Sequence, residues 1–356
     1  MKKTIKLVKN KPCLQTQVVA RIIVSVFSVF SFTLQAQELF PHNEPASTVP
    51  KGVIAIRPFF KTYSEVTLMR RMYALRVMYG LLPKLTIMGT ISVTNHHGND
   101  LPPDLVTHVH SGTQTTYFTN TIQRGVKYPY KFSGVYLYAK YRFFTRDKKN
   151  QHFRMAAYAD WSNVGVPHDE AEPSLMDDTK GYGGGLIATY LKNHLAVSFT
   201  GGFIVPKYYE GYSPDIGGQK VPTKVQYGRA AIYNLSFGYL VHPKKYADYD
   251  QTNINLYIEF IGKSYEAAVV TQYGYMNVPI QTPLLQKGNY VEVHPSVQAV
   301  FDSNLRIDLS VGLPLIKQSY ARLYPVYYIG IQRYFFPGAR KIMLNKAKNR
   351  INRLHE

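Results

Sequence analysis

Apolar and polar residues alternate along most of this chain. In the stretch 305–315, LRIDLSVGLPL, every second residue is a large aliphatic, while Arg306, Asp308 and Ser310 stand between them. Successive side chains of a β-strand point to opposite faces, so this pattern predicts a strand with one apolar and one polar face. The same alternation predicts about twelve strands, near 52–62, 71–81, 84–95, 131–144, 151–163, 179–191, 194–205, 226–241, 252–265, 289–301, 304–315 and 322–336.

The lengths of the connections indicate how these strands are arranged. Alternation alone would also fit a soluble β-sandwich, which buries its apolar faces in a core. Short connections, however, alternate with mostly long ones along the chain. The short ones are 82–84, 145–150, 192–194, 242–250 and 302–304, and the long ones are 96–130, 164–178, 206–225 and 266–288. Short turns at one rim and long loops at the other favour an all-β fold: a closed antiparallel transmembrane up-and-down β-barrel, with its apolar faces toward lipid.

The first 36 residues have the pattern of a secretory signal peptide. A basic stretch precedes the apolar run IIVSVFSVFSFTL, which ends at Leu34-Gln35-Ala36 and is too short for a comfortable membrane-spanning helix. We therefore expect a signal peptide at 1–36, a mature N-terminal segment at 37–50, the barrel at 51–336 and a basic periplasmic tail at 337–356. Cys13, the single cysteine, precedes the predicted cleavage site, so the mature chain would have no disulfide.

The charge of the chain is strongly positive, at +20 for the precursor. Six of the basic residues lie in the first 36 residues, which contain no acid, so +14 would remain after cleavage. The remaining charges are scattered and form no recognition motif, and an exported protein does not meet nucleic acid. We expect outer-membrane lipid and lipopolysaccharide as surroundings, the barrel-assembly machinery as a partner during biogenesis, a small-molecule solute as a ligand, and neither nucleic acid nor a cofactor.

The polar faces of the predicted strands carry the candidate lumen residues. These are Arg57, Arg76, Lys140, Arg142, Arg154, Glu259, Glu292, His294, Arg306 and Asp308. Basic residues outnumber acidic ones, and the up-and-down order places Lys140, Arg142 and Arg154 toward the periplasmic rim. Two interpretations stay open: a network of ion pairs that braces a narrow barrel, in which these residues pair with Glu259, Glu292 or Asp308, or a pathway that prefers anions.

Glycine and proline also fall inside the predicted strands. Gly181, Gly183 and Gly185 lie on the predicted lumen face, where small residues either make room for a plug or ligand or relieve curvature of the sheet. Pro58 and Pro295 each remove a donor from the predicted ladder, which indicates bulges or shifted boundaries.

Histidines and serines are the remaining candidates for chemistry. His96, His97, His108 and His110 fall in the 96–130 connection, either as metal ligands or as ordinary polar residues of an exposed loop, and no spacing defines a tetrahedral set. His294 and Ser296 are near in sequence, but no glycine elbow surrounds a serine, so we do not expect an enzyme.

The end of the chain carries a resemblance to a known class. The stretch 326–336, VYYIGIQRYFF, resembles the C-terminal strand that the barrel-assembly machinery reads. With LQAQ at 34–37, the chain resembles the small exported barrels of Bacteroidota and, in pattern, the outer-membrane family grouped with phenol-degradation and fatty-acid-type transporters. That resemblance implies an outer-membrane passive transporter or channel for small solutes. The alternatives are a structural or surface-interaction barrel with a filled lumen and, third, an outer-membrane enzyme.

Overall fold

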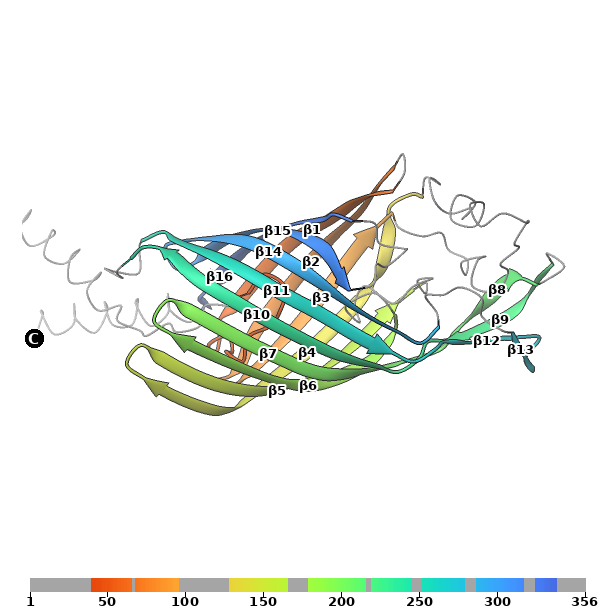
Figure 1. Ribbon diagram of the computed structural model, residues 1–356, viewed down its shortest axis with the longest axis horizontal. Coiled ribbons are helices and arrows are strands. Elements are labelled where there is room, and N and C mark those ends of the chain that lie inside the picture. The colour runs from red at the N-terminus through yellow and green to blue at the C-terminus, as the bar shows by residue number, and fades with distance from the viewer. Residues whose placement is uncertain are drawn as a thin grey trace, which may run out of the picture. The chain divides into compact units, whose positions relative to one another are not determined.

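Twelve antiparallel strands close into a barrel in the computed structural model (Figure 1). The structure describes residues 40–65, 68–95, 128–165, 179–215, 219–244, 251–278, 286–316 and 324–337, all within one compact unit. The barrel strands are β1 (Ile54–Glu65), β2 (Leu68–Leu82), β3 (Leu85–Thr94), β4 (Lys131–Lys148), β5 (Gln151–Val164), β6 (Gly181–Lys192), β7 (Leu195–Pro206), β10 (Ala230–His242), β11 (Asn253–Tyr265), β14 (Gly288–Phe301), β15 (Leu305–Ile316) and β16 (Val326–Phe335). Pairing of β1 with β16 closes the barrel. The predicted fold class is confirmed, and the strand boundaries differ from the prediction by only a few residues.

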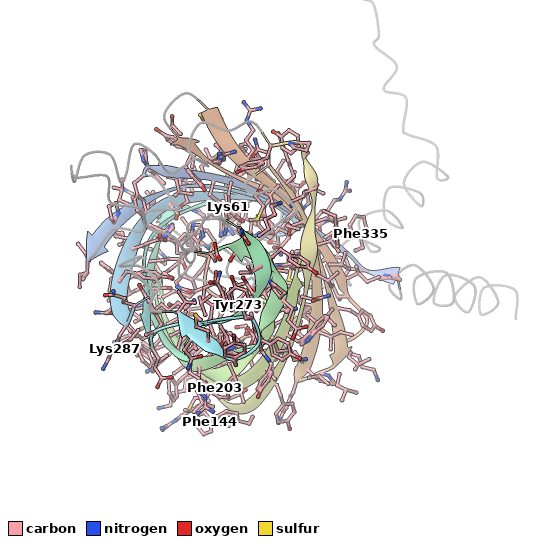
Figure 2. All side chains as sticks on the ribbon, turned by 90° about the vertical axis from the view of Figure 1, so that its right-hand side faces the viewer. Lys61, Phe144, Phe203, Tyr273, Lys287 and Phe335 are labelled. Carbon is pink, nitrogen blue, oxygen red and sulfur yellow. The ribbon has the colours of Figure 1, made fainter. Side chains whose placement is uncertain are left out.

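The outer surface of the barrel is apolar and the inner surface is polar. In β15, Leu309 is 52% exposed, whereas Asp308 is 0% and Ser310 is 5% exposed. Figure 2 shows Phe144, Phe203 and Phe335 on the outside of the barrel and Lys61 on its inner side. Such an apolar belt is stable only against lipid, so the barrel spans a bilayer with its polar face turned inward.

Two of the predicted long loops contain strands, so that part of the prediction is wrong. The connections 206–225 and 266–288 contribute to a separate four-stranded sheet, in the order β13-β12-β9-β8. Its strands are β8 (Tyr209–Pro214), β9 (Lys220–Gln226), β12 (Val269–Gln272) and β13 (Met276–Val278). Gly211, Pro214 and Pro222 give β8 and β9 the composition of a loop, and β12 and β13 are only four and three residues long. The apolar cluster of Tyr209, Val225, Val270 and Val278 nevertheless holds these short strands together.

Short turns join strands at the rim where β1 begins. Asn150, Asn193, Asp302 and Ser303 adopt positive φ there. Asn and Asp are enriched in this left-handed region, which suits them to tight connections between antiparallel strands. These turns are the short connections of the sequence prediction, although β4 and β5 extend into 145–150 and leave only a two-residue turn.

Inward-facing glycines provide space for aromatic rings from neighbouring strands. A Cβ at Gly202 would meet the Tyr158 hydroxyl at 2.2 Å, and a Cβ at Gly238 would meet the Tyr257 ring at 2.4 Å. Gly185, one of the glycines noted in the sequence, also faces the Tyr158 ring, which a Cβ would meet at 2.9 Å. Tyrosine rings therefore take the space at these three positions.

The prolines interrupt the ladders of two strand pairs. The β1–β16 register runs from Ile56 to Phe59 without a pair at Pro58. The β14–β15 register likewise passes from Val293 to Ser296, skipping Pro295. Each proline therefore lies at a gap in pairing with one neighbouring strand, as its missing N–H requires, while on the other side Pro58 is opposite Leu75 and Pro295 is opposite Ile258.

Several sequence predictions lie outside the described residues. They are the signal peptide at 1–36, the histidines His96, His97, His108 and His110, and the tail beyond residue 337. Within the described ranges, no helix is long and apolar enough to cross a membrane.

Candidate functional site

Residues 40–50, here called the inner segment, lie inside the barrel. Phe40 and Ala46 are 1% and 0% exposed, and Val49 is also buried. Pro41, Pro45 and Pro50 interrupt the segment, which forms no strand. Its hydrogen bonds instead reach inward-facing side chains of β1, β3, β4, β5, β6, β11 and β15. The lumen is therefore filled at this level by the chain's own N-terminal region.

The first half of the inner segment is bound through its main chain. Arg306 donates to the carbonyl of Phe40 at 3.0 Å, and Arg57 donates to the carbonyl of Pro41. The amides of His42 and Asn43 donate to the two carboxylate oxygens of Glu259, each at 2.9 Å. One buried carboxylate thus binds two consecutive amides.

Glu44 is the charged centre of the inner segment. Its carboxylate accepts from Lys140 at 3.1 Å and from Arg76 at 3.3 Å. Burial acts to raise the pKa of Glu44, but the positive charges of Lys140 and Arg76 outweigh burial and lower the pKa from 4.5 to about 2. Glu44 is therefore a carboxylate at neutral pH and ties the segment to β2 and β4.

The second half of the inner segment returns toward the rim with the short turns. Lys140 donates to the carbonyl of Pro45 at 2.7 Å, and the Ala46 amide donates to Thr189 at 2.9 Å. The Val49 amide donates to Thr86 at 2.8 Å. The Thr48 hydroxyl then donates to the carbonyl of Pro83 in the β2–β3 turn at 3.2 Å. The segment thus runs back to the rim from which β1 begins.

An ion network on the wall supports the start of the segment. Asp308 pairs with Arg57 at 3.0 Å and with Arg306 at 2.8 Å, and it also accepts from Gln298 at 2.9 Å. These groups are buried, so the pairing compensates the cost of removing their charges from water. The two arginines that bind the carbonyls of Phe40 and Pro41 are held in place by the same carboxylate.

A second polar cluster surrounds the ring of His42. Its Nε2 lies 2.9 Å from the Ser310 hydroxyl, and its ring centroid lies 4.4 Å from that of His294. His294 in turn contacts Glu292 at 2.9 Å, and Glu292 accepts from Tyr324. Ser296 donates to the main-chain carbonyl of His294 and not to its ring.

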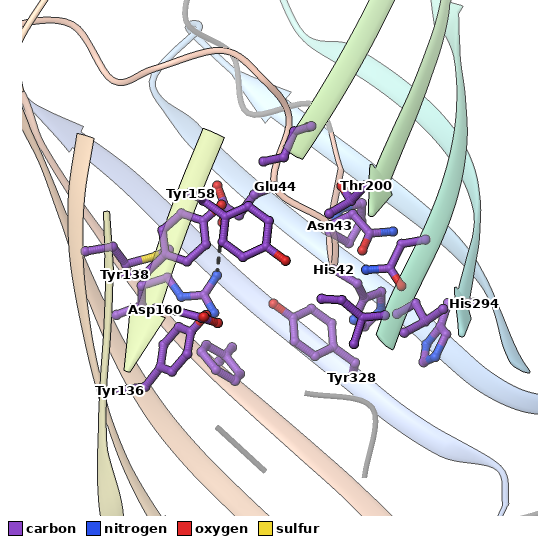
Figure 3. A pocket seen from close by; sticks show the side chains of 18 of the residues that line it. His42, Asn43, Glu44, Tyr136, Tyr138, Tyr158, Asp160, Thr200, His294 and Tyr328 are labelled. Atoms are coloured by element: carbon purple, nitrogen blue, oxygen red, sulfur yellow. Dashed lines mark hydrogen bonds and ion pairs between the residues drawn. The ribbon is translucent and has the colours of Figure 1, made fainter. Parts of the chain in front are cut away.

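A cavity of about 170 Å³ adjoins the inner segment (Figure 3). Pro41, His42, Asn43 and Glu44 form part of its wall. The remaining wall has three parts. The aromatic part has Tyr136, Tyr138, Tyr158, Phe59 and Tyr328, the aliphatic part has Ile187, Ile204, Ile232, Ile261 and Met88, and the polar part has Lys61, Arg76, Asp160, Thr200, Asn234, Glu292 and His294. Tyr138 and Tyr158 stack with centroids 5.2 Å apart, and Tyr136 donates to Asp160 at 2.9 Å. The cavity can therefore hold a small amphipathic group.

The structure brings most of the predicted lumen residues to the inner segment. Those that contact it directly are Arg57, Arg76, Lys140, Arg154, Glu259 and Arg306, and Asp308 acts through the arginines. Glu292 and His294 line the cavity. Arg142 differs from the others, because it is half-exposed at the rim and donates to Pro83 at 3.3 Å.

Sequence reasoning missed the inner segment as the partner of these charges. Glu44, His42 and Asn43 were not among the candidates, although the basic excess on the lumen face requires anionic partners. A polar, proline-rich segment without alternation, directly before the first strand, was the available signal. Among the described residues, no three His, Cys, Asp or Glu side chains are arranged to hold a metal ion.

These features define a class of protein: a transmembrane β-barrel of the outer-membrane type, whose polar lumen holds its own N-terminal segment. No family model matches the chain, and no curated protein matches it either.

Several solved structures share part of this arrangement of strands. An outer membrane channel from Pseudomonas putida F1 is 12% identical, with a TM-score of 0.49, and the match covers 84% of this chain and 100% of that one. The toluene transporter TbuX from Ralstonia pickettii is 13% identical, with a TM-score of 0.40, over 82% and 92%. The NanC porin is 7% identical, with a TM-score of 0.38, over 79% and 98%.

Proposed function

We propose that this protein is an outer-membrane channel for small solutes whose pathway is closed by the inner segment and opens when that segment leaves its seat. The observation that carries the proposal is the seat of Glu44 between Lys140 and Arg76. The segment forms no strand and belongs to neither sheet, so it can move without breaking the barrel wall.

The chemistry of the seat favours reversible displacement. An apolar plug would expose its apolar surface to water on leaving, at about 25 cal/mol for each Å². Apart from its prolines, the inner segment buries only three apolar side chains, those of Phe40, Ala46 and Val49. Its other contacts are hydrogen bonds and ion pairs, and water entering the lumen can solvate Lys140, Arg76 and Glu259 once the segment has gone. The net strength of such bonds is modest, at roughly 0.5–1.5 kcal/mol each or somewhat more when a charge is involved.

Displacement would also change the charge of the pathway. Glu44 would leave the level of Lys140 and Arg76, so both cations would lose that counter-charge. Cations gathered in a narrow tube attract anions and repel cations, so the open pathway should prefer small anionic or polar solutes.

The test is conductance before and after the segment is released. A specific protease site inserted after Lys51, which is exposed in the turn before β1, would allow the full chain to fold before it is cut. Planar-bilayer recordings should show little current before cleavage and clear steps after cleavage and a high-salt wash. The matched control carries a scrambled insert of equal length that the protease does not cut.

The second candidate is a structural or surface-interaction barrel with a permanently filled lumen. The main-chain hydrogen bonds along the inner segment favour it, since they are what a fixed internal brace would need. Under this function, the cleaved segment would stay bound and the current would remain absent. If the cleaved barrel does conduct, reversal potentials in a salt gradient measure whether it prefers anions or cations. A variant with Lys140, Arg142 and Arg154 neutralised together serves as the comparison.

A further inference from the structure

The lumen binds the inner segment largely through groups that every peptide has. Arg306, Arg57 and Lys140 donate to the carbonyls of Phe40, Pro41 and Pro45. The main-chain amides of the segment donate to acceptors on the wall. Glu259 accepts from the amides of His42 and Asn43, Thr189 accepts from that of Ala46, and Thr86 accepts from that of Val49. Donors and acceptors on the wall are thus matched to the carbonyls and amides of a polypeptide.

Fewer contacts depend on the side chains of the segment. The strongest is the carboxylate of Glu44 between Lys140 and Arg76. His42 contacts Ser310, Asn43 donates to Ser236, and Ser47 accepts from Arg154. Because the main-chain bonds do not depend on sequence, a different peptide would retain most of the binding energy if it keeps an acidic residue at this place and an aromatic residue in place of Phe40, whose ring packs on Tyr257.

We propose that the lumen is a binding site for short peptides that carry one carboxylate, and that such a peptide takes the place of residues 40–50. This inference deepens the proposed function, because it rests on displacement of the inner segment and names a class of solute that the pathway would accept. The length of the inner segment sets the length of the peptide, and the cavity beside His42, Asn43 and Glu44 accommodates a bulkier side chain at the bend.

Glu259 distinguishes a peptide from a free anion. A small anion would be attracted to Lys140 and Arg76, but it cannot use Glu259, a buried acceptor aimed at the inner segment. Two consecutive main-chain amides satisfy both oxygens of this carboxylate at 2.9 Å. A peptide supplies those donors together with the anionic side chain one residue later, and this combination is what the wall is built to bind.

The charged wall supports a role beyond a fixed brace. Replacing buried charges by well-packed apolar residues is often neutral or stabilising, so a permanent plug needs none of them. Arg57, Lys140, Glu259 and Arg306 are all buried, and each contacts the main chain of the inner segment. Main-chain recognition by polar groups is the arrangement that lets one site accept different sequences.

The experiment measures peptide binding to the full chain after cleavage at the site inserted behind Lys51 and a high-salt wash. Fluorescence anisotropy in detergent would follow four labelled peptides. The first is QELFPHNEPASTVP, residues 37–50. The second keeps Phe40, Glu44 and the prolines and has alanine elsewhere. The third carries N-methyl groups on the amides that correspond to His42 and Asn43, and the fourth has glutamine in place of Glu44.

We expect the first two peptides to bind with affinities within about tenfold of each other and the other two to bind at least about tenfold more weakly, since a hydrogen bond to a charged group is worth roughly 1.5–3 kcal/mol. On the barrel side, Glu259→Gln should weaken the first two peptides alike. Ser310→Ala is the matched control, because the Ser310 hydroxyl contacts the segment at the His42 ring. This substitution should weaken binding of the native peptide and leave binding of the alanine peptide unchanged.

Three results would overturn the proposal. They are binding of the native peptide without the alanine peptide, equal binding of the N-methylated peptide, and absence of binding by any peptide to a washed barrel whose circular dichroism shows intact strands. Because anisotropy does not depend on current, a barrel that conducts but binds no peptide would contradict this inference alone. A barrel that binds peptide and never conducts would contradict the proposed function.

Discussion

The ammonium group of Lys140 donates to the carboxylate of Glu44 at 3.1 Å, across a sequence separation of 96 residues. The same ammonium donates to the Pro45 carbonyl at 2.7 Å, and Arg76 contacts the other carboxylate oxygen at 3.3 Å. A cation on the barrel wall therefore holds both the side chain and the main chain at the bend of the inner segment. Substitutions in the Lys140–Glu44 pair are therefore the most direct test of whether the segment can leave its place in the lumen.

Removing the Glu44 charge should loosen the inner segment. Glu44→Gln leaves Lys140 buried without its anion, and breaking a buried pair by removing one partner costs about 3–5 kcal/mol when water cannot enter. Water in the lumen reduces that cost, so we expect about 2 kcal/mol, which corresponds to roughly a thirtyfold rise in the ratio of open to closed time in planar bilayers.

A double variant and a neighbouring position provide the controls for Glu44. Glu44→Gln combined with Lys140→Met removes both charges and should recover part of the closed time. Arg142→Gln alters a half-exposed cation two residues further along β4 that does not contact Glu44, and it should behave as the parent. Equal opening in all three variants would show that the charge on Glu44 does not hold the segment.

Lowering the pH should release the inner segment only when the pH falls below about 3. Because the pKa of Glu44 is lowered to about 2 in the folded protein, its ion pairs are fully present above its ordinary value of 4.5 and are lost as pH falls through about 2. Conductance attributable to Glu44 should therefore be constant between pH 7 and pH 5 and rise below about pH 3. Other carboxylates also titrate in this range, so the quantity to compare is the difference between the parent and Glu44→Gln. A Glu44-dependent rise centred above pH 5 would contradict the assigned ion pairs.

Gly238→Ala should disturb the anchor of Phe40. The added Cβ would lie 2.4 Å from the ring of Tyr257, which itself packs on Phe40 with centroids 5.4 Å apart. Overpacking of this kind costs typically about 1–3 kcal/mol, measured as a lower midpoint of thermal unfolding in detergent. Gly89→Ala is the matched control within a strand, because its Cβ would meet only a Leu137 methyl at 3.7 Å. Comparable destabilisation by both substitutions would rule out crowding at Tyr257 as the cause.

Leu309→Arg should destabilise the barrel in lipid. Leu309 lies near the middle of β15 on the outer face, and a charged residue facing the bilayer midplane costs about 2–4 kcal/mol. Ile316→Arg, on the same strand at its end, should cost only about 0–1 kcal/mol. Urea unfolding in lipid vesicles measures both. If Leu309→Arg were as stable as the parent while Ser310→Arg was not, the assignment of the two faces would be inverted.

The strands and their two faces could be predicted from the sequence because both are local properties. Side chains alternate with a period of two, so Leu309 and Asp308 belong to opposite faces whatever the rest of the chain does. The alternation of short and long connections then distinguished a membrane barrel from a sandwich. The short strands β8 and β9 escaped prediction because their glycine and prolines are typical of loops, and β12 and β13 because they are only four and three residues long. Pairing with one another stabilises all four strands.

The place of residues 40–50 was decided by tertiary structure alone. The segment has no alternation and no regular hydrogen-bonding partner within itself, so its local sequence does not distinguish an extramembrane linker from a lumen plug. Its amides and carbonyls are satisfied by Glu259, Thr189 and Arg306, which come from three different strands and meet only when the barrel has closed. The sequence alone therefore determined which charges face inward. Which partner they bind followed from the closed fold, because a buried main chain must find its hydrogen bonds wherever the surrounding wall provides them.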